Sequence, residues 1–416
     1  MNARGRGFSR RRFVTGALTA GAAVGAGAIG GCSADAPPNS AAPSAPRFVP
    51  FDGTTQVGIT LVPPPARALM AAFSLQVADR AGLGTLFGEL TSEIRGLMSG
   101  RPPEVRDDAY PPVDSGLLGE TPPPDDLSVV VSVGASLFDD RFGLADRLPP
   151  ELVTMPFLAN DRLDPERSHG DLLLSFEAGH SDTLQFALRQ LMRRTRGEMV
   201  LKWMTEGYTR GAGTGNAGGT PRNLLGFKDG TANPDARDGE LMDRYVWVGA
   251  DDGHPEWAVG GSYQAVRIIR MFVEFWDRTQ LAEQEALFGR YKLSGAPLGM
   301  EQEYDDPRFD DDPDGQRISL DAHIRRANPR TPESDESRML RRGFSYSRGF
   351  DRAGRLDQGL AFISYQRSLQ KAFLAVQARL KGERLEEYVL PEGGGFFFAL
   401  PGVPEPGRFL GDALVA

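Results

Sequence analysis

Residues 226–234 read Gly-Phe-Lys-Asp-Gly-Thr-Ala-Asn-Pro, and this stretch holds one carboxylate, Asp229, between two glycines. Glycine lets the backbone turn tightly and approach a ligand closely, and the Asn-Pro pair that follows favours a turn over a helix or strand. We therefore expect a loop that can direct the side chain of Asp229 into a pocket. Since aspartate and glycine are also ordinary turn residues, a capping role for Asp229 stays open at this point.

Two later segments carry an imidazole and a guanidinium. Residues 321–330 read Asp-Ala-His-Ile-Arg-Arg-Ala-Asn-Pro-Arg and contain His323, and residues 339–344 read Met-Leu-Arg-Arg-Gly-Phe and contain Arg341. A porphyrin iron needs only one protein ligand, because the macrocycle fills four positions, so a single histidine can hold it. The arginines that follow His323 are suited to pairing with carboxylates such as haem propionates.

The other three histidines stand in loop or turn contexts. None of His169, His180 and His254 has a second histidine or a cysteine at metal-chelating spacing, which argues against a tetrahedral zinc site. A structural role is the ordinary expectation for a lone histidine, and the surroundings of His323 set it apart.

The N-terminus has the composition of an export signal. Residues 1–12 carry five arginines and no acid, and residues 13–31 form an uncharged run rich in glycine and alanine. The sequence Ser-Arg-Arg-Arg-Phe-Val at residues 9–14 fits the twin-arginine pattern, which suits a protein that takes up its cofactor before export. A general secretion signal is the alternative. Removal of residues 1–31 moves the formal charge from −9 to −14, which argues against nucleic acid and anionic membranes as partners.

Cys32 is the only cysteine, and it ends the apolar run in a context that resembles a lipobox. A lipid anchor at Cys32 and ordinary cleavage after residues 34–36 are both open. A single cysteine excludes an internal disulfide and cysteine-based metal sites. Residues 32–50 are rich in proline, alanine and serine, which is typical of a linker.

The remaining chain predicts an α+β protein with two related domains, at residues 51–220 and 221–416. Strand-like apolar runs alternate with helical patterns in both halves, which favours antiparallel sheets with helices on one face. The predicted strands are residues 127–135, 171–178, 265–273, 359–365 and 395–400, and the predicted helices are residues 66–80, 181–194, 277–289 and 369–380.

Two further motif matches lack their required context. Gly213, Gly215 and Gly218 fit a dinucleotide fingerprint, but no strand leads into them and Thr-Pro follows instead of a helix. The acidic run at residues 310–315, with Asp321, matches part of a calcium loop, but the last ligand is aspartate and flanking helices are not evident. We interpret the first as a loop and the second as a solvated acidic loop.

The segments around Asp229, His323 and Arg341 resemble those of the dye-decolourising peroxidases, in particular the exported, EfeB-like deferrochelatase/peroxidase branch. Residues 168–176 and 393–402 also resemble that branch. The resemblance spans residues 51–416. It implies two ferredoxin-like domains, with haem b in the C-terminal half.

The resemblance also implies roles for individual residues. His323 would be the proximal haem ligand, Asp229 the distal acid/base and Arg341 the distal arginine. Arg341 is preferred to Arg342 because the family uses the first arginine of this pair. Arg330 would contact a haem propionate and Thr231 would belong to the cofactor site. A C-terminal carboxylate would orient His323; the candidates are Glu383, Glu386 and Glu387, of which we assign Glu387 to the cofactor site.

These residues predict an exported peroxidase that reduces hydrogen peroxide and oxidises a dye-like or phenolic electron donor. A distal base can move the proton of the peroxide, and an adjacent cation stabilises the developing charge. Because aspartate has an ordinary pKa of ~3.9, we expect turnover to be highest in mildly acidic buffer. One alternative is a deferrochelatase that releases iron from haem for an iron-uptake system, and another is a non-enzymatic haem or iron carrier. The family also implies a homo-oligomer.

Overall fold

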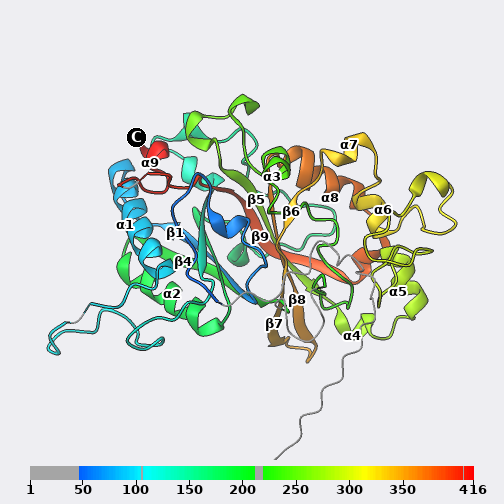
Figure 1. Ribbon diagram of the computed structural model, residues 1–416, viewed down its shortest axis with the longest axis horizontal. Helices are drawn as coiled ribbons and strands as arrows, with labels where there is room; N and C mark the ends of the chain where they lie inside the picture. Colours follow the sequence, from blue (N-terminus) through cyan, green and yellow to red (C-terminus); the bar gives the residue numbers. More distant parts are fainter. Residues whose placement is uncertain (1–45, 105, 211–218, 406) are drawn as a thin grey trace, which may run out of the picture. The chain divides into compact units, whose positions relative to one another are not determined.

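The computed structural model describes residues 46–416, except residues 105, 211–218 and 406 (Figure 1). The predicted export signal, Cys32, most of the linker and the Gly213–Gly218 loop lie outside the described residues. Within the described ranges, no helix is both long enough and apolar enough to cross a membrane.

The first half of the chain forms a four-stranded antiparallel sheet with two helices. Its strands follow the order β2-β3-β1-β4 across the sheet. This β-α-β-β-α-β arrangement is the ferredoxin-like motif. The elements are β1 (Arg67–Leu75), α1 (Arg80–Met98), β2 (Ser128–Gly134), β3 (Leu172–Ala178), α2 (Ser181–Arg194) and β4 (Met199–Tyr208).

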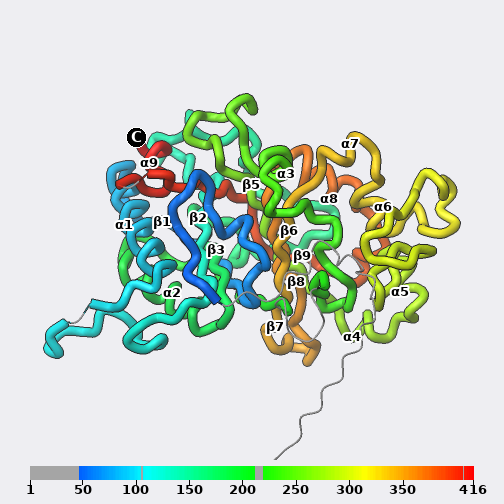
Figure 2. The backbone as a smooth tube through the Cα atoms, in the orientation of Figure 1, coloured from blue at the N-terminus to red at the C-terminus, as the bar shows by residue number. Residues whose placement is uncertain are grey.

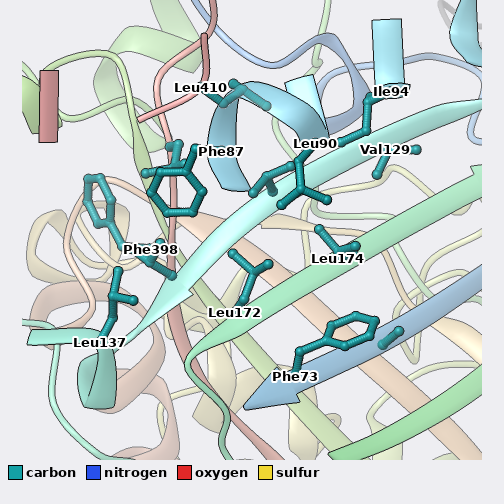
Figure 3. Packing of buried hydrophobic residues seen from close by; sticks show 14 of the residues in the cluster. Phe73, Phe87, Leu90, Ile94, Val129, Leu137, Leu172, Leu174, Phe398 and Leu410 are labelled. Atoms are coloured by element: carbon teal, nitrogen blue, oxygen red, sulfur yellow. The ribbon is translucent and has the colours of Figure 1, made fainter. Parts of the chain in front are cut away.

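Helix α1 packs on this sheet through one apolar stripe. Leu83, Phe87, Leu90 and Ile94 recur three or four residues apart and are fully buried, as expected for a helix with one face on the core. The Asp79 carboxylate caps the helix by accepting a hydrogen bond of 2.8 Å from the backbone N–H of Gly82. Figure 3 shows the side chains of α1 facing those of the strands. The strand residues labelled there are Phe73, Val129, Leu172, Leu174 and Phe398.

The second half repeats the same order with longer insertions. Its strands are arranged β9-β5-β8-β7. The short strand β6 precedes β7 and pairs with the C-terminal end of β8. The elements are β5 (Ser262–Met271), α4 (Val273–Trp276), α5 (Leu281–Phe288), α6 (His323–Ala327), α7 (Pro332–Asp335), β6 (Leu340–Arg341), β7 (Phe344–Phe350), β8 (Leu356–Gln366), a π-helical turn (Gln370–Leu374), α8 (Ala375–Leu380) and β9 (Val389–Ala399).

Helix α3 (Gly239–Tyr245) lies between the two halves in sequence, and α9 (Asp412–Val415) ends the chain. Short 3-10 turns occupy Val57–Ile59, Ala135–Phe138, Ala145–Arg147, Pro165–Arg167, Ala250–Asp252, Glu256–Ala258, Phe309–Asp311 and Arg384–Glu387.

The two sheets join at both edges and close into a ring of strands. Strand β2 pairs with β9, where Ser132 lies opposite Ala399, and β4 pairs with β7, where Tyr208 lies opposite Ser345. Figure 2 shows β9, near the C-terminal end of the colour scale, running past strands of the first half. Residues of both halves, among them Met70 and Tyr365, then share one buried cluster.

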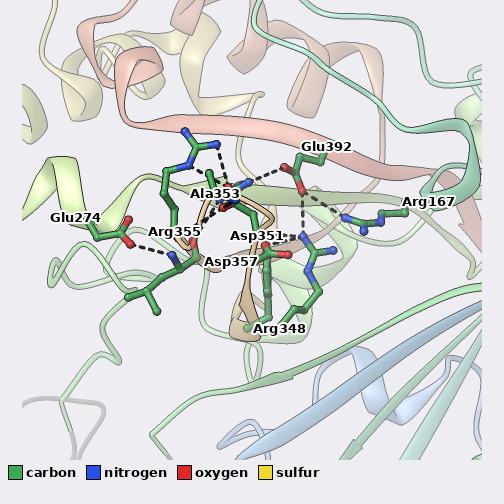
Figure 4. A network of polar contacts seen from close by, with 11 residues as sticks. Arg167, Glu274, Arg348, Asp351, Ala353, Arg355, Asp357 and Glu392 are labelled. Carbon is green, nitrogen blue, oxygen red and sulfur yellow. Dashed lines mark hydrogen bonds and ion pairs between the residues drawn. The ribbon is translucent and has the colours of Figure 1, made fainter.

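Ion pairs connect the β7–β8 hairpin to β9 (Figure 4). The Arg348 guanidinium donates to Asp357 within the hairpin at 3.0 Å and to Glu392 of β9 at 2.9 Å, and Arg270 of β5 donates to Asp351 of the hairpin at 2.7 Å. The Arg348–Glu392 contact fixes β9 at Glu392, next to Pro391, a residue that lines the cavity described below.

The predicted α+β class is confirmed, and one helix prediction is wrong. Most of residues 66–80 belongs to β1 (Arg67–Leu75), and α1 begins only at Arg80. Strand β1 lies between β3 and β4 and is buried on both faces, so its apolar residues run continuously without the alternation of a half-buried strand. Strands β4 and β7 were not predicted. The domain boundary near residue 220 stays a prediction.

Candidate active site

A cavity of about 710 Å³ is lined mostly by the second half of the chain, and the three sequence segments singled out above all reach it. Its walls come from the Asp229 loop, β5, α6, β6, β8, α8 and the segment before β9, and residues 157–161 of the first half complete them. Most of the lining is apolar, which lets the cavity hold a large flat hydrophobic group. The apolar residues include Leu225, Phe227, Ile269, Met271, Phe288, Leu360, Phe362, Phe373, Leu374 and Leu385.

The loop that carries Asp229 is held by aromatic packing and backbone hydrogen bonds. Phe227 stacks on Phe288 with ring centroids 4.0 Å apart, and the Trp276 indole donates to the Leu225 carbonyl at 2.9 Å. Gly226 and Gly230 have φ values of 86° and 119°, a region that other residues rarely adopt. The two glycines therefore permit the bend that directs Asp229 toward the cavity.

On another wall, His323 is oriented by a buried carboxylate. It is the first residue of α6, and its Nδ1 lies 2.8 Å from Oε2 of Glu383. Nε2 has no hydrogen-bond partner among the described residues, so it is the ring nitrogen available to a ligand. Burial lowers the pKa of His323, and the Glu383 carboxylate outweighs this effect and raises the pKa above its usual value. A carboxylate on the second nitrogen is the usual way to fix and strengthen a metal-binding imidazole.

This geometry corrects the choice of Glu387. Glu387 is exposed at the end of a 3-10 turn and does not line the cavity, whereas Glu383 is buried at the start of that turn. The turn directs the two carboxylates in different directions, although they are only four residues apart.

Asp229 and Arg341 face each other in the cavity without forming a tight pair. Nη1 of Arg341 lies 3.5 Å from Oδ1 of Asp229, and the two side chains are 29% and 27% exposed. Both groups influence the pKa of His323, so all three lie within electrostatic reach of one another. A loosely paired carboxylate keeps lone pairs free to accept a proton from a bound molecule.

Asn233 fixes Arg341, a role that could not be predicted from its place in a turn. Its Oδ1 accepts from Nε of Arg341 at 3.1 Å and from the backbone N–H at 3.3 Å, while its Nδ2 donates to the Arg341 carbonyl at 2.8 Å. One amide thus holds both the backbone and the guanidinium. In the sequence, the one indication of this role was that Asn233 is an amide residue only four positions after Asp229.

The neighbouring Arg342 has a different environment. It is buried in an ion pair with Glu177 of β3, with Nε 2.8 Å from Oε1, and it also donates to the Leu61 carbonyl at 2.8 Å. Arg341 lines the cavity and Arg342 does not, as expected when successive side chains of an extended segment point to opposite sides.

We expect the two arginines to separate stability from chemistry. Arg342→Met should lower the free energy of unfolding by about 3–5 kcal/mol, because it leaves the buried carboxylate of Glu177 without its partner. Arg341→Met, at a partly exposed position, should change it by less than ~1 kcal/mol. Urea unfolding of both variants without cofactor measures this difference; equal destabilisation would contradict it.

A third cation, Arg290, was missed by the sequence analysis. It is buried, lines the cavity, and donates to the carbonyls of Gly295 (2.6 Å) and Glu303 (2.8 Å). Burial lowers the pKa of Arg290 to about 10, and the nearby charges of Arg330 and Arg341 contribute to the decrease. Arg290 and Arg330 both line the cavity and lie within electrostatic reach of each other, which suits an anionic group on a ligand.

The other predicted cofactor residues also border the cavity. Arg330 is exposed, with a φ of 65°, and its backbone N–H donates to the Asn328 side chain at 3.2 Å. Thr231 lines the cavity, but its hydroxyl donates to Oε1 of Glu303 at 2.9 Å.

In the acidic loop at residues 310–315, the Asp312 carboxylate accepts a hydrogen bond from the backbone N–H of Ile318 at 2.9 Å and forms an ion pair with Arg325.

An apolar cavity with one available imidazole nitrogen and a group of cations fits a haem with its two propionates. The donor set on this wall, one histidine backed by a carboxylate, is sufficient for a porphyrin iron. The fold and site thus define a haem-dependent enzyme.

Comparison with known proteins gives the family. The chain matches the N-terminal part of the Dyp-type peroxidases over residues 56–209 and the C-terminal part over residues 220–404, and it belongs to this family. It is 51% identical over 368 residues to a deferrochelatase of Escherichia coli O157:H7, covering 88% of this chain and 87% of that protein.

Solved structures agree with the assignment. A DyP-type peroxidase from Cellulomonas bogoriensis matches with a TM-score of 0.78 and 33% identity, over 91% of this chain and 99% of that one. Ferric DtpA from Streptomyces lividans matches with a TM-score of 0.80 and 32% identity, over 91% and 100%.

Proposed function

We propose that this protein is an exported haem peroxidase that reduces hydrogen peroxide with electrons from dye-like or phenolic donors. The observation that carries the proposal is the loosely paired Asp229 and Arg341, in the same cavity as the carboxylate-backed His323. Haem b, when bound, supplies the iron at which peroxide is cleaved and the capacity to take electrons from a donor.

His323 would hold the haem through Nε2, while Glu383 keeps the imidazole ring in place through Nδ1. Arg330 and Arg290, which line the cavity, would neutralise the propionates. Thr231 borders the same site and contributes mainly by holding the loop.

Asp229 and Arg341 carry the proton and charge chemistry. The Asp229 carboxylate accepts the proton of one peroxide oxygen and passes it to the other oxygen, which leaves as water when the O–O bond breaks. The Arg341 guanidinium stabilises the negative charge that develops on the leaving oxygen. Asn233 limits the motion of Arg341, so little reorganisation is needed when that charge develops.

A second candidate function uses the same cavity with haem as the substrate. The similarity to proteins named deferrochelatase favours a reaction that removes iron from haem and delivers it to an iron-uptake system. A non-enzymatic carrier is a weaker candidate, because a carrier has no need for the Asp229–Arg341 pair.

The location and assembly are proposed from the sequence. The arginine-rich start and the apolar run favour twin-arginine export to the periplasm or another extracytoplasmic space, with Cys32 as a candidate lipid anchor. Residues 51–220 and 221–416 would be the two domains, and the functional unit a homo-oligomer.

The haem spectrum after addition of one equivalent of peroxide tests the proposal. A rapid shift of the main absorption band, reversed by a phenolic donor, is expected for the peroxidase. Loss of iron with the porphyrin ring intact would favour the deferrochelatase. A spectrum that does not respond would leave only the carrier and would overturn both enzyme proposals.

A further inference from the structure

Glu303 is a buried carboxylate behind the Asp229 loop, and the proposed mechanism does not use it. Its side chain is 8% exposed. It forms an ion pair with Lys228 and accepts hydrogen bonds from the hydroxyls of Thr220 and Thr231, the latter at 2.9 Å. Lys228 and Thr231 stand on either side of Asp229 in the loop. One carboxylate thus fixes the loop at both sides of the proposed catalytic residue.

The segment that carries Glu303 is itself fixed to the cavity wall. Arg290 donates to the Glu303 carbonyl at 2.8 Å and to the Gly295 carbonyl at 2.6 Å. A continuous set of contacts therefore runs from Arg290 through Glu303 to the residues that flank Asp229. Burial raises the pKa of Glu303, but Lys228 and the two hydroxyls outweigh it and bring the pKa below its usual value, so the carboxylate stays charged.

Lys228 is the reason why this charge matters for the chemistry. It precedes Asp229, lines the cavity, and is held against Glu303 with 17% of its side chain exposed. Its aliphatic part passes close to Gly295, where an added Cβ would lie 2.6 Å from Cδ of Lys228. Without Glu303, the Lys228 ammonium group would lose its carboxylate partner, and Asp229, the next residue in the sequence, would be the carboxylate left for it to pair with.

We propose that Glu303 is a positioning residue for Asp229: it fixes both flanks of the loop and holds the Lys228 ammonium away from the catalytic carboxylate. This inference rests on the proposed role of Asp229. Its chemical consequence is that Asp229 faces Arg341 of β6 and His323 of α6, but is not neutralised by its own neighbour in sequence.

The test compares Glu303→Gln, Lys228→Met and the double variant, all in the haem-loaded protein. In Glu303→Gln the released ammonium should pair with Asp229, so that the rate of reaction with peroxide falls roughly 10-fold or more and the acidic limb of its pH profile moves to lower pH. The double variant lacks that ammonium and should recover most of the rate and the original pH profile. Glu301→Gln, at an exposed position on the same loop, is the matched control and should match the wild type.

A binding measurement separates this inference from the proposed function. Cyanide binds haem iron as an anion but enters as the protonated acid, so its association rate also depends on a free base near the iron. We expect the cyanide association rate to fall in Glu303→Gln and to recover in the double variant, even if the protein has no peroxidase turnover. An unchanged Glu303→Gln variant, or a double variant no better than Glu303→Gln, would overturn the proposal. If Glu303→Gln does not fold, Thr231→Val removes one contact and should give a smaller loss of the same sign; no loss there would also overturn it.

Discussion

Replacement of His323 by alanine is expected to abolish haem retention. In the described part of the chain, His323 supplies a cavity-lining imidazole whose Nε2 is free and whose Nδ1 is held by Glu383. Loss of a residue that only supports a metal ligand costs 10–100-fold in affinity, so loss of the ligand itself should cost more than about 100-fold. The ratio of haem absorbance to protein absorbance after gel filtration measures this directly.

His180→Ala is the matched control for this experiment. His180 also has its Nδ1 against a carboxylate, at 2.7 Å from Asp125, but its side chain is 74% exposed and it does not line the cavity. That variant should retain haem at the wild-type level. Full haem content in His323→Ala, with the fold intact, would show that another residue holds the iron.

The residues to which we assign the chemistry stand in unusual local patterns, so the sequence could point to them as candidates. Asp229 lies between glycines with an Asn-Pro pair behind it, and His323 is followed by arginines, and neither pattern is needed to build a core. The structure brings both segments and Arg341 to one cavity. The resemblance to a known family supplied their order and their roles, which the residues alone left open.

The choice among the C-terminal glutamates depended on information that the sequence does not carry. Glu383, Glu386 and Glu387 differ in sequence position by at most four residues, and all three precede β9. Which carboxylate reaches His323 is decided by the 3-10 turn at residues 384–387 and by its packing against α5 and β9. A short turn of this kind has no strong sequence signature.

Supporting residues were missed for a related reason. Asn233, Arg290 and Glu303 act through partners that are 108, 13 or 75 residues away in the chain. Such contacts exist only after the sheets and loops have been assembled. The error at residues 66–80 has the same origin, because burial on both faces of β1 is set by the strands beside it.

Asp229→Asn is expected to slow the reaction with peroxide by roughly 10²–10⁴-fold while haem stays bound. Asparagine has nearly the same shape as aspartate and can still contact Arg341, but its amide cannot take up the proton that the peroxide must lose. Stopped-flow measurement of the haem absorbance after mixing with peroxide gives the rate.

Arg341→Leu should lower the same rate by about 10²–10³-fold, because the negative charge that develops on the leaving oxygen is no longer stabilised, and haem should again be retained.

The pH profile of the Asp229 variant decides between a base and a merely structural carboxylate. If Asp229 is the base, the wild-type rate should fall as the pH is lowered and the carboxylate is protonated, and the Asn variant should be slow and nearly independent of pH over that range. A variant that is slow but keeps the wild-type profile would assign the base to another group. If Asp229→Asn lost the reaction with peroxide but still released iron from haem, the two candidate functions would depend on different residues of the same cavity. Deferrochelatase activity would then rest on His323 and the cations around the propionates, without the Asp229–Arg341 pair.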